Sequence, residues 1–222
     1  MLNFIEKPAS GNSNKYLIIF LHGYGCDKND LMPLSKDFST ISNEICFLSV
    51  DAPELCSSGY GYQWFPLETL TFTPKGVYEL IRNDITYVKD FIEKQSCKLN
   101  IDYKNIFLVG FSQGAMVALA SALRFNKKIG GVISFSGFQP DTKETLELEL
   151  KTKQNILLIH GTDDLVVPYD LMAYSKNLLE SFGIDVKTYT NIGVDHCINM
   201  QGLMVAVDYV RDIISQDLML YV

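Results

Sequence analysis

Residues 105–121 read NIFLVGFSQGAMVALAS and combine three structural signals in one stretch. The apolar run 105–110 is typical of a buried strand, and the almost entirely apolar run 114–125 is typical of a helix packed against a sheet. Between them stands GFSQG at 110–114, which fits the pattern G-x-S-x-G. A strand, this pattern and a helix in succession predict a nucleophile elbow. The turn is so tight that side chains at 110 and 114 would collide with neighbouring backbone, and the two glycines leave Ser112 projecting above the sheet edge.

Ser112 also has a simpler interpretation. Serine is one of the residues preferred at the start of a helix, where its side chain caps the free backbone N–H groups. The stretch alone leaves helix cap and nucleophile close to even. A serine hydroxyl is a poor nucleophile until a base takes its proton. The nucleophile interpretation therefore depends on finding a base elsewhere in the chain.

Further apolar runs predict a sheet around this stretch. They lie at 16–23, 45–53, 130–137 and 155–161, with a weaker one at 186–190. Segments with helical spacing stand between them, at 76–96, 169–181 and 200–214. Strands that alternate with helices indicate an α/β protein with a mostly parallel, doubly wound sheet. No linker or internal repeat interrupts the pattern, so we expect one domain over residues 1–222.

The composition excludes several classes of partner. The chain has 19 basic and 26 acidic residues, a net charge of −7, and no cluster of Lys and Arg. This balance argues against nucleic acid. No apolar run approaches the ~20 residues of a membrane span, and the first residues do not resemble a signal peptide. The five scattered cysteines form no CxxC pair, which indicates reduced thiols, no zinc site and a cytoplasmic location.

Histidine is the usual base for a serine nucleophile, and the chain has three histidines. His22 and His160 each stand before a glycine at the end of a predicted strand. His196 lies in the loop NIGVDHCIN, between the last predicted strand and the last predicted helix. This is the third position in the chain order nucleophile, carboxylate, histidine. His196 is therefore the predicted base for Ser112.

The carboxylate that orients the base is predicted in HGTDDLVVP, residues 160–168, at the carboxyl end of a strand. Ligands bind at this end of parallel sheets. Spacing alone does not choose between Asp163 and Asp164. Asp195 is a poorer candidate because the side chains of adjacent residues, such as Asp195 and His196, diverge.

Acyl transfer also needs two donors for the oxyanion, usually backbone N–H groups. The amide of Gln113, directly after the serine and at a helix N-terminus, is the first candidate. The second is expected in FLHGYGCDKND, residues 20–30, where Gly23 and Gly25 allow the backbone to approach a substrate closely.

A long connection at 54–75 is rich in aromatic residues. Connections of this length are usually functional or disordered, and disorder does not favour so many aromatics. Either the loop folds onto a small core of its own, or Tyr62, Trp64 and Phe65 form one wall of an apolar substrate groove, with the segment acting as a small lid-like loop.

With these stretches placed, the sequence resembles the small carboxylesterase/phospholipase family of the α/β-hydrolase superfamily, which includes bacterial carboxylesterases and acyl-protein thioesterases. The resemblance runs from about residue 16 to 210. It rests on FLHGYG, DAPE, YQWF, GFSQG, HGTDDLVVP and GVDHCIN, in the family's order. It implies an α/β-hydrolase fold without a separate cap domain.

The resemblance also implies a role for each matching residue. Ser112 resembles the nucleophile, His196 the base and Asp164, rather than Asp163, the carboxylate. The oxyanion donors correspond to the amides of Tyr24 and Gln113, and Trp64 resembles an element that lines the acyl groove. Two positions depart from the family pattern, namely Ala115 in place of a common glycine and Pro66 after the aromatic pair.

The expected function is that of a serine hydrolase that cleaves carboxylic esters or thioesters through an acyl-enzyme on Ser112, with no cofactor or metal. The substrate would be a small-molecule or lipid ester or thioester, or an acylated protein. A non-catalytic binder of hydrophobic ligands with the same fold, and a serine peptidase, are the alternatives. The sequence leaves self-association open.

Overall fold

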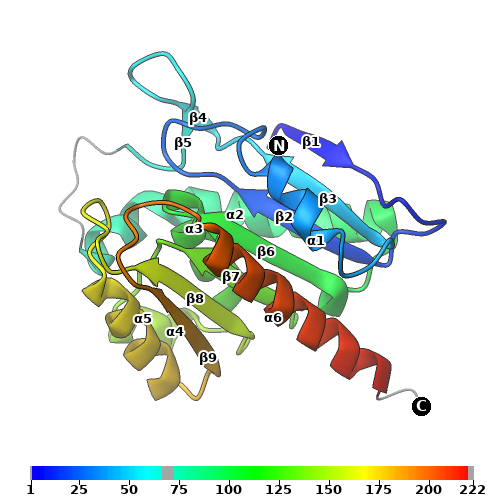
Figure 1. Cartoon of the computed structure of the whole chain (residues 1–222). Coiled ribbons are helices and arrows are strands. Elements are labelled where there is room, and N and C mark those ends of the chain that lie inside the picture. Colours follow the sequence, from blue (N-terminus) through cyan, green and yellow to red (C-terminus); the bar gives the residue numbers. More distant parts are fainter. Residues whose placement is uncertain (1, 67–72, 220–222) are drawn as a thin grey trace.

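The computed structural model describes residues 2–66 and 73–219, and its centre is a seven-stranded sheet (Figure 1). Across the sheet the order is β1 (Phe4–Lys7), β3 (Ile45–Val50), β2 (Tyr16–Leu21), β6 (Ile106–Phe111), β7 (Gly131–Phe135), β8 (Ile156–Gly161) and β9 (Val186–Asn191). β1 runs antiparallel to β3, and the other neighbouring strands of this sheet are parallel. The mostly parallel sheet predicted from the sequence is confirmed.

Helices cover both faces of the sheet (Figure 1). One face carries α2 (Pro74–Leu99), α3 (Gln113–Leu123), α4 (Lys143–Glu149) and α5 (Asp170–Ser181), and the other carries α1 (Ser35–Phe38) and α6 (Met200–Met219). Strands β4 (Glu54–Leu55) and β5 (Tyr62–Gln63) pair as a separate hairpin, and short 3₁₀ helices span Met32–Leu34 and Tyr103–Asn105. Within the described ranges, no helix has both the length and the apolar character that crossing a membrane requires.

Side chains that alternate along the strands build two hydrophobic cores, one on each face. In β2, the core under α2 and α3 receives Leu17, Ile19 and Leu21, whereas the core under α6 receives Tyr16, Ile18 and Phe20. All six side chains are buried. A strand buried on both faces reads as a continuous apolar run, which explains why period-2 alternation was absent from the sequence.

All six predicted strands are present, and their ends differ from the prediction by at most three residues. The prediction did not include β1, the short helices α1 and α4, or the β4–β5 hairpin. These elements are short: β1 is an edge strand of four residues, FIEK, and α4 has seven residues, so neither gives a long periodic signal. Residues 67–72 of the predicted aromatic loop, Phe72 included, lie outside the described residues.

The turn from β6 into α3 has the close packing expected of the elbow. Ser112 takes φ 51° and ψ −117°, in a region that residues other than glycine rarely occupy. A Cβ at Gly110 would lie 2.5 Å from Ala115 Cα, and one at Gly114 would lie 2.2 Å from Leu21 O. Both distances are far inside van der Waals contact, so the expectation that side chains at 110 and 114 would collide with backbone is confirmed.

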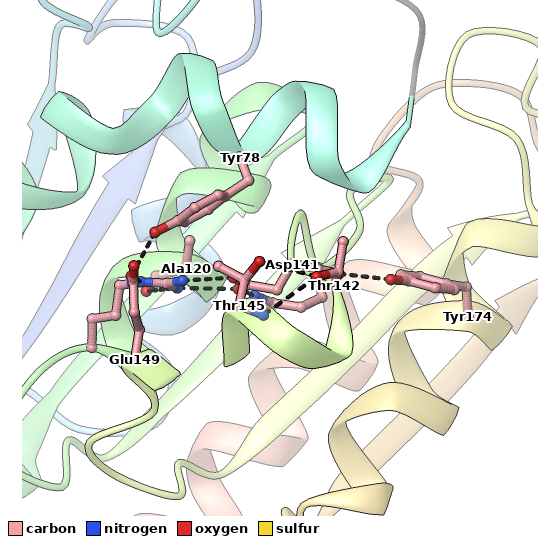
Figure 2. A network of polar contacts seen from close by, with 9 residues as sticks. Tyr78, Ala120, Asp141, Thr142, Thr145, Glu149 and Tyr174 are labelled. Carbon is pink, nitrogen blue, oxygen red and sulfur yellow. Dashed lines mark hydrogen bonds and ion pairs between the residues drawn. The ribbon is translucent and has the colours of Figure 1, made fainter. Parts of the chain in front are cut away.

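A buried network of polar contacts holds the segment between β7 and α4 against α3 and α2 (Figure 2). The Arg124 guanidinium donates to both carboxylate oxygens of Asp141, at 3.1 and 2.6 Å, and to Glu149 Oε2 at 2.6 Å. Tyr78 Oη donates to Glu149, and Tyr174 Oη donates to the Asp141 carbonyl. Asp141 is fully buried, and this bidentate pairing compensates the cost of removing its charge from water.

Asp84 places an ionisable carboxyl on the buried face of α2. The residue is 3% exposed, and its Oδ1 has no hydrogen-bond partner in the described part of the chain. Burial raises the pKa of Asp84 to about 7, and the negative charge of Glu54 acts in the same direction. Folding therefore favours the neutral acid at this position.

This raised pKa predicts that Asp84→Asn stabilises the protein more at high pH than at low pH. An unfolded Asp loses its proton near pH ~4, whereas folded Asp84 keeps it until the pH approaches its pKa of about 7. The unfolded state thus binds fewer protons over this window, and the wild-type free energy of unfolding falls as the pH rises through it. Relative to wild type, Asp84→Asn should gain on the order of 2 kcal/mol between about pH 5 and about pH 8, measured by urea denaturation.

Asp90→Asn is the matched control, because Asp90 is an exposed aspartate on the same helix. Its effect on stability should be small at both pH values. A pH-independent effect of Asp84→Asn would contradict the buried, protonated state of Asp84.

Candidate active site

Three loops at one edge of the sheet carry the predicted nucleophile, carboxylate and base. Ser112 directly follows β6, Asp164 lies in the loop after β8, and His196 lies in the loop between β9 and α6. β6, β8 and β9 point in the same direction, so their carboxyl ends share an edge (Figure 1). This is the edge at which parallel sheets bind ligands.

The three side chains form one hydrogen-bonded chain. His196 Nε2 lies 3.0 Å from Ser112 Oγ, and His196 Nδ1 lies 2.7 Å from Asp164 Oδ2. An ionised carboxylate only accepts, so we assign the imidazole proton to Nδ1, and Nε2 then has a lone pair for the Ser112 hydroxyl. A nucleophile, a base and a group that orients the base have this arrangement in serine hydrolases.

The side chain of Ser112 does not act as a helix cap. Ser112 occupies the N-cap position of α3, but its hydroxyl makes no capping hydrogen bond and lies against His196 instead. The backbone N–H of Ser112 donates to Phe135 O at 2.9 Å, which fixes the turn to β7. The simpler interpretation of this serine is therefore not supported by the geometry.

Asp164 is held as a carboxylate by surrounding donors. Its Oδ1 accepts from the backbone N–H groups of Val166, at 2.9 Å, and Val167, at 2.8 Å, while Oδ2 accepts from His196. Burial alone raises the pKa of Asp164, but the hydrogen bonds from His196, Val167 and Val166 outweigh it and hold this pKa below its ordinary value. Asp164 thus remains charged and can stabilise an imidazolium.

Asp164, and not Asp163, contacts His196, the predicted base. Asp163 is exposed, and its Oδ1 accepts from Thr162 Oγ1 at 2.7 Å. Asp195 is also exposed, although it is next to His196 in the chain. Of the three aspartates considered, Asp164 is the one whose carboxylate lies within hydrogen-bond distance of His196. Its assignment as the orienting carboxylate stays a prediction.

The two predicted oxyanion donors border the serine. Gln113 is the first residue of α3. The loop that carries Tyr24 also packs closely, because a Cβ at Gly23 would lie 3.4 Å from Ser112 Cβ and one at Gly114 would lie 2.5 Å from His22 O. The assignment of the Tyr24 and Gln113 amides as oxyanion donors stays a prediction.

The side chain of Gln113 binds the backbone of the aromatic segment that contains Trp64 and Phe65. Its Oε1 accepts from the Trp64 N–H at 3.1 Å, and its Nε2 donates to Phe65 O at 2.8 Å, so it ties the aromatic segment to the elbow. The Trp64 indole N–H donates to His22 O at 2.9 Å. Trp64 therefore joins the elbow to the loop that carries Tyr24.

The predicted groove residues are packed rather than open. Trp64 and Phe65 are each 1% exposed and belong to the core beneath α2 and α3. Tyr62 is half-buried and lines a pocket with Leu2, Asp51 and other residues. A role for the three aromatic residues in an acyl groove stays a prediction.

His160 is a residue near the site to which sequence reasoning gave no role. Its Nε2 lies 2.9 Å from Val167 O and 3.2 Å from Asp164 Oδ2. Both neighbours are acceptors, so Nε2 carries the proton, and burial lowers the pKa of His160 and favours the neutral ring. The only signal in the sequence was its place before glycine at a strand end, which does not distinguish this contact from ordinary packing.

Comparison with known proteins gives consistent results at the level of sequence and structure. Residues 3–214 match the model of the family described as Phospholipase/Carboxylesterase. An acyl-protein thioesterase 1 from Candida albicans is 30% identical, and the match covers 96% of this chain and 98% of that protein.

Two solved structures extend the comparison to the fold. The crystal structure of esterase PE8 superposes with a TM-score of 0.90 at 32% identity, covering 96% of this chain and 99% of that one. The crystal structure of Arabidopsis thaliana SOBER1 superposes with a TM-score of 0.79 at 26% identity, covering 90% of this chain and 99% of that one. With a family match that spans almost the whole chain, this protein belongs to the phospholipase/carboxylesterase family.

Proposed function

We propose that this protein hydrolyses carboxylic esters or thioesters through an acyl-enzyme on Ser112. The observation that carries the proposal is the hydrogen-bonded chain from Ser112 through His196 to Asp164. Membership of the phospholipase/carboxylesterase family supports the same reaction class.

In the first half of the reaction, His196 Nε2 accepts the proton of Ser112 Oγ as this oxygen attacks the carbonyl carbon of the substrate. Asp164 stabilises the imidazolium that forms. The imidazolium then donates this proton to the leaving alcohol or thiol, the bond to the leaving group breaks, and an acyl ester remains on Ser112.

In the second half, water replaces the leaving group. His196 accepts a proton from water as the water oxygen attacks the acyl ester, and returns it to Ser112 Oγ as the carboxylic acid departs. In both halves the carbonyl oxygen becomes an oxyanion that the amides of Tyr24 and Gln113 stabilise. A single donor of this kind contributes on the order of 10²–10³ in kcat.

The surroundings of the site favour a substrate with an apolar acyl group. Leu165 directly follows Asp164 and is 97% exposed, and Ile192 lies four residues before His196 and is 86% exposed. On the loops that carry Asp164 and His196, these two side chains would contact an acyl chain bound at Ser112. The substrate would be a small-molecule or lipid ester or thioester, or an acylated protein; the name of the Candida albicans relative supports the thioester.

We also propose that the protein acts in the cytoplasm. All five cysteines lie within the described residues and are free thiols, which is typical of a reducing compartment.

Ser112→Ala should abolish turnover and covalent labelling together. Removal of the nucleophile is expected to lower kcat by about 10⁴–10⁶ on a p-nitrophenyl ester. A fluorophosphonate probe, which reacts with activated serines, should label the wild type and fail to label the variant. Cys197→Ser is the control, because Cys197 is an exposed nucleophile next to His196 and its loss should leave labelling intact. A labelled Ser112→Ala protein would contradict the proposal.

We expect Asp164→Asn to lower activity far more than Asp163→Asn does. Asn at 164 cannot hold the Nδ1–H tautomer of His196 or stabilise its cation, so kcat should fall by on the order of 10³–10⁴. Asn at 163 keeps an oxygen that can accept from Thr162 Oγ1 at this exposed position, and kcat should stay within about threefold of wild type. Equal losses in the two variants would show that Asp164 is not the orienting carboxylate.

A further inference from the structure

His22 makes two hydrogen bonds from a fully buried position directly after β2. Its Nδ1 lies 2.6 Å from Gly23 O, and its Nε2 lies 3.0 Å from the backbone nitrogen of Ala52. His22 is 0% exposed, and its two ring nitrogens bond to backbone groups rather than to Ser112, His196 or Asp164. The reaction described above assigns it no part.

The partners of His22 determine its protonation. A carbonyl oxygen only accepts, so Nδ1 must carry the hydrogen toward Gly23 O; a backbone N–H only donates, so Nε2 must offer a lone pair to Ala52. A second proton on the ring would place an N–H against the Ala52 N–H. Burial also lowers the pKa of His22 and favours the same neutral ring.

The Gly23 carbonyl and the Tyr24 N–H belong to the same amide group. A trans peptide is planar, with its C=O and N–H pointing in opposite directions, and the described chain has no cis peptide bond. Holding the Gly23 oxygen therefore fixes the direction of the Tyr24 N–H. A hydrogen bond to the carbonyl also polarises the amide and makes its N–H a stronger donor.

The preceding amide of this loop is held as well. The Trp64 indole N–H donates to His22 O at 2.9 Å, so two successive carbonyls of the loop, those of His22 and Gly23, each accept a side-chain N–H. The loop lies against the nucleophile, as the 3.4 Å approach of a Gly23 Cβ to Ser112 Cβ indicates.

We infer that His22 is a positioning residue of the oxyanion hole: as the neutral Nδ1–H tautomer it orients and polarises the Gly23–Tyr24 amide so that the Tyr24 N–H meets the oxyanion. The inference rests on the proposed function, because it needs a reaction at Ser112. The role proposed for His22 depends on its Nδ1, which bonds to Gly23 O, and not on its Nε2, which bonds to Ala52.

Two substitutions of His22 test the hydrogen bonds of its two ring nitrogens one at a time. In His22→Asn the side-chain amide can reproduce the Nδ1–H donor to Gly23 O, and in His22→Gln the longer side chain can reproduce the Nε2 acceptor for Ala52. Each variant loses one buried hydrogen bond, so their melting temperatures should fall by similar amounts. Only His22→Gln loses the bond that orients the Tyr24 amide.

We expect His22→Gln to lower kcat on a p-nitrophenyl ester by about 10- to 100-fold with KM within about threefold, since part of one oxyanion donor is lost. A trifluoromethyl ketone, which forms a tetrahedral adduct with an active serine, should bind more weakly by a similar factor. His22→Asn should keep kcat within about fivefold of wild type on the same scale.

Gln154→Leu is the stability control, because Gln154 is a buried side chain that binds backbone groups of Ile129, Ala122 and Lys127 at the opposite end of the sheet. It should lower the melting temperature and leave kcat and ketone binding unchanged. Equal kcat losses in His22→Asn and His22→Gln, or a loss that follows the melting temperature across all three variants, would overturn the inference.

A measurement on the wild type does not depend on how the variants fold. ¹H–¹⁵N NMR of the imidazole should show His22 as the Nδ1–H tautomer, with the Nδ1 proton shifting when the trifluoromethyl ketone binds. An Nε2–H tautomer would overturn the inference. A wild-type protein with neither ester turnover nor fluorophosphonate labelling would instead contradict the proposed function itself.

Discussion

The close approach of the first turn of α3 to the end of β2 is the constraint on which the site depends. A Cβ at Gly114 would lie 2.2 Å from Leu21 O, so only a residue without a side chain allows this contact. The contact places Ser112, the amide of Gln113 and the loop that begins at His22 within a few ångströms of one another. The strained backbone of Ser112 is held by the same packing, with its N–H bonded to Phe135 O.

From this junction, polar contacts extend in two directions. On one side, His196 and Asp164 continue from Ser112, and Asp164 is kept charged by two backbone N–H groups and His196. On the other side, Trp64 donates its backbone N–H to Gln113 Oε1 and its indole N–H to His22 O. Ser112, Asp164, Trp64, Gln113 and His22 are buried, His196 is half-buried, and each has a hydrogen-bond partner, an arrangement that fixes these groups before a substrate binds.

Much of this was predictable from the sequence because the relevant signals are local. GFSQG combines a strand end, two glycines and a helix start, and the strand that precedes Asp164 is a continuous apolar run. The contacts of His22 and Trp64 were not predictable, since they join residues 30 and 42 positions apart and depend on how the chain packs. Sequence spacing could not separate Asp164 from Asp163, because the two are adjacent; in the structure, Asp164 is the one that contacts His196.

The most direct test of the account is to trap the acyl-enzyme. Turnover of p-nitrophenyl butyrate would be quenched with acid, and peptides of the wild-type protein would be analysed by mass spectrometry. The account predicts a butyryl group on the peptide that contains Ser112, at that residue, disappearing once the substrate is exhausted. Turnover with no covalent intermediate under conditions that slow deacylation, or a butyryl group on another residue such as Cys197, would contradict it.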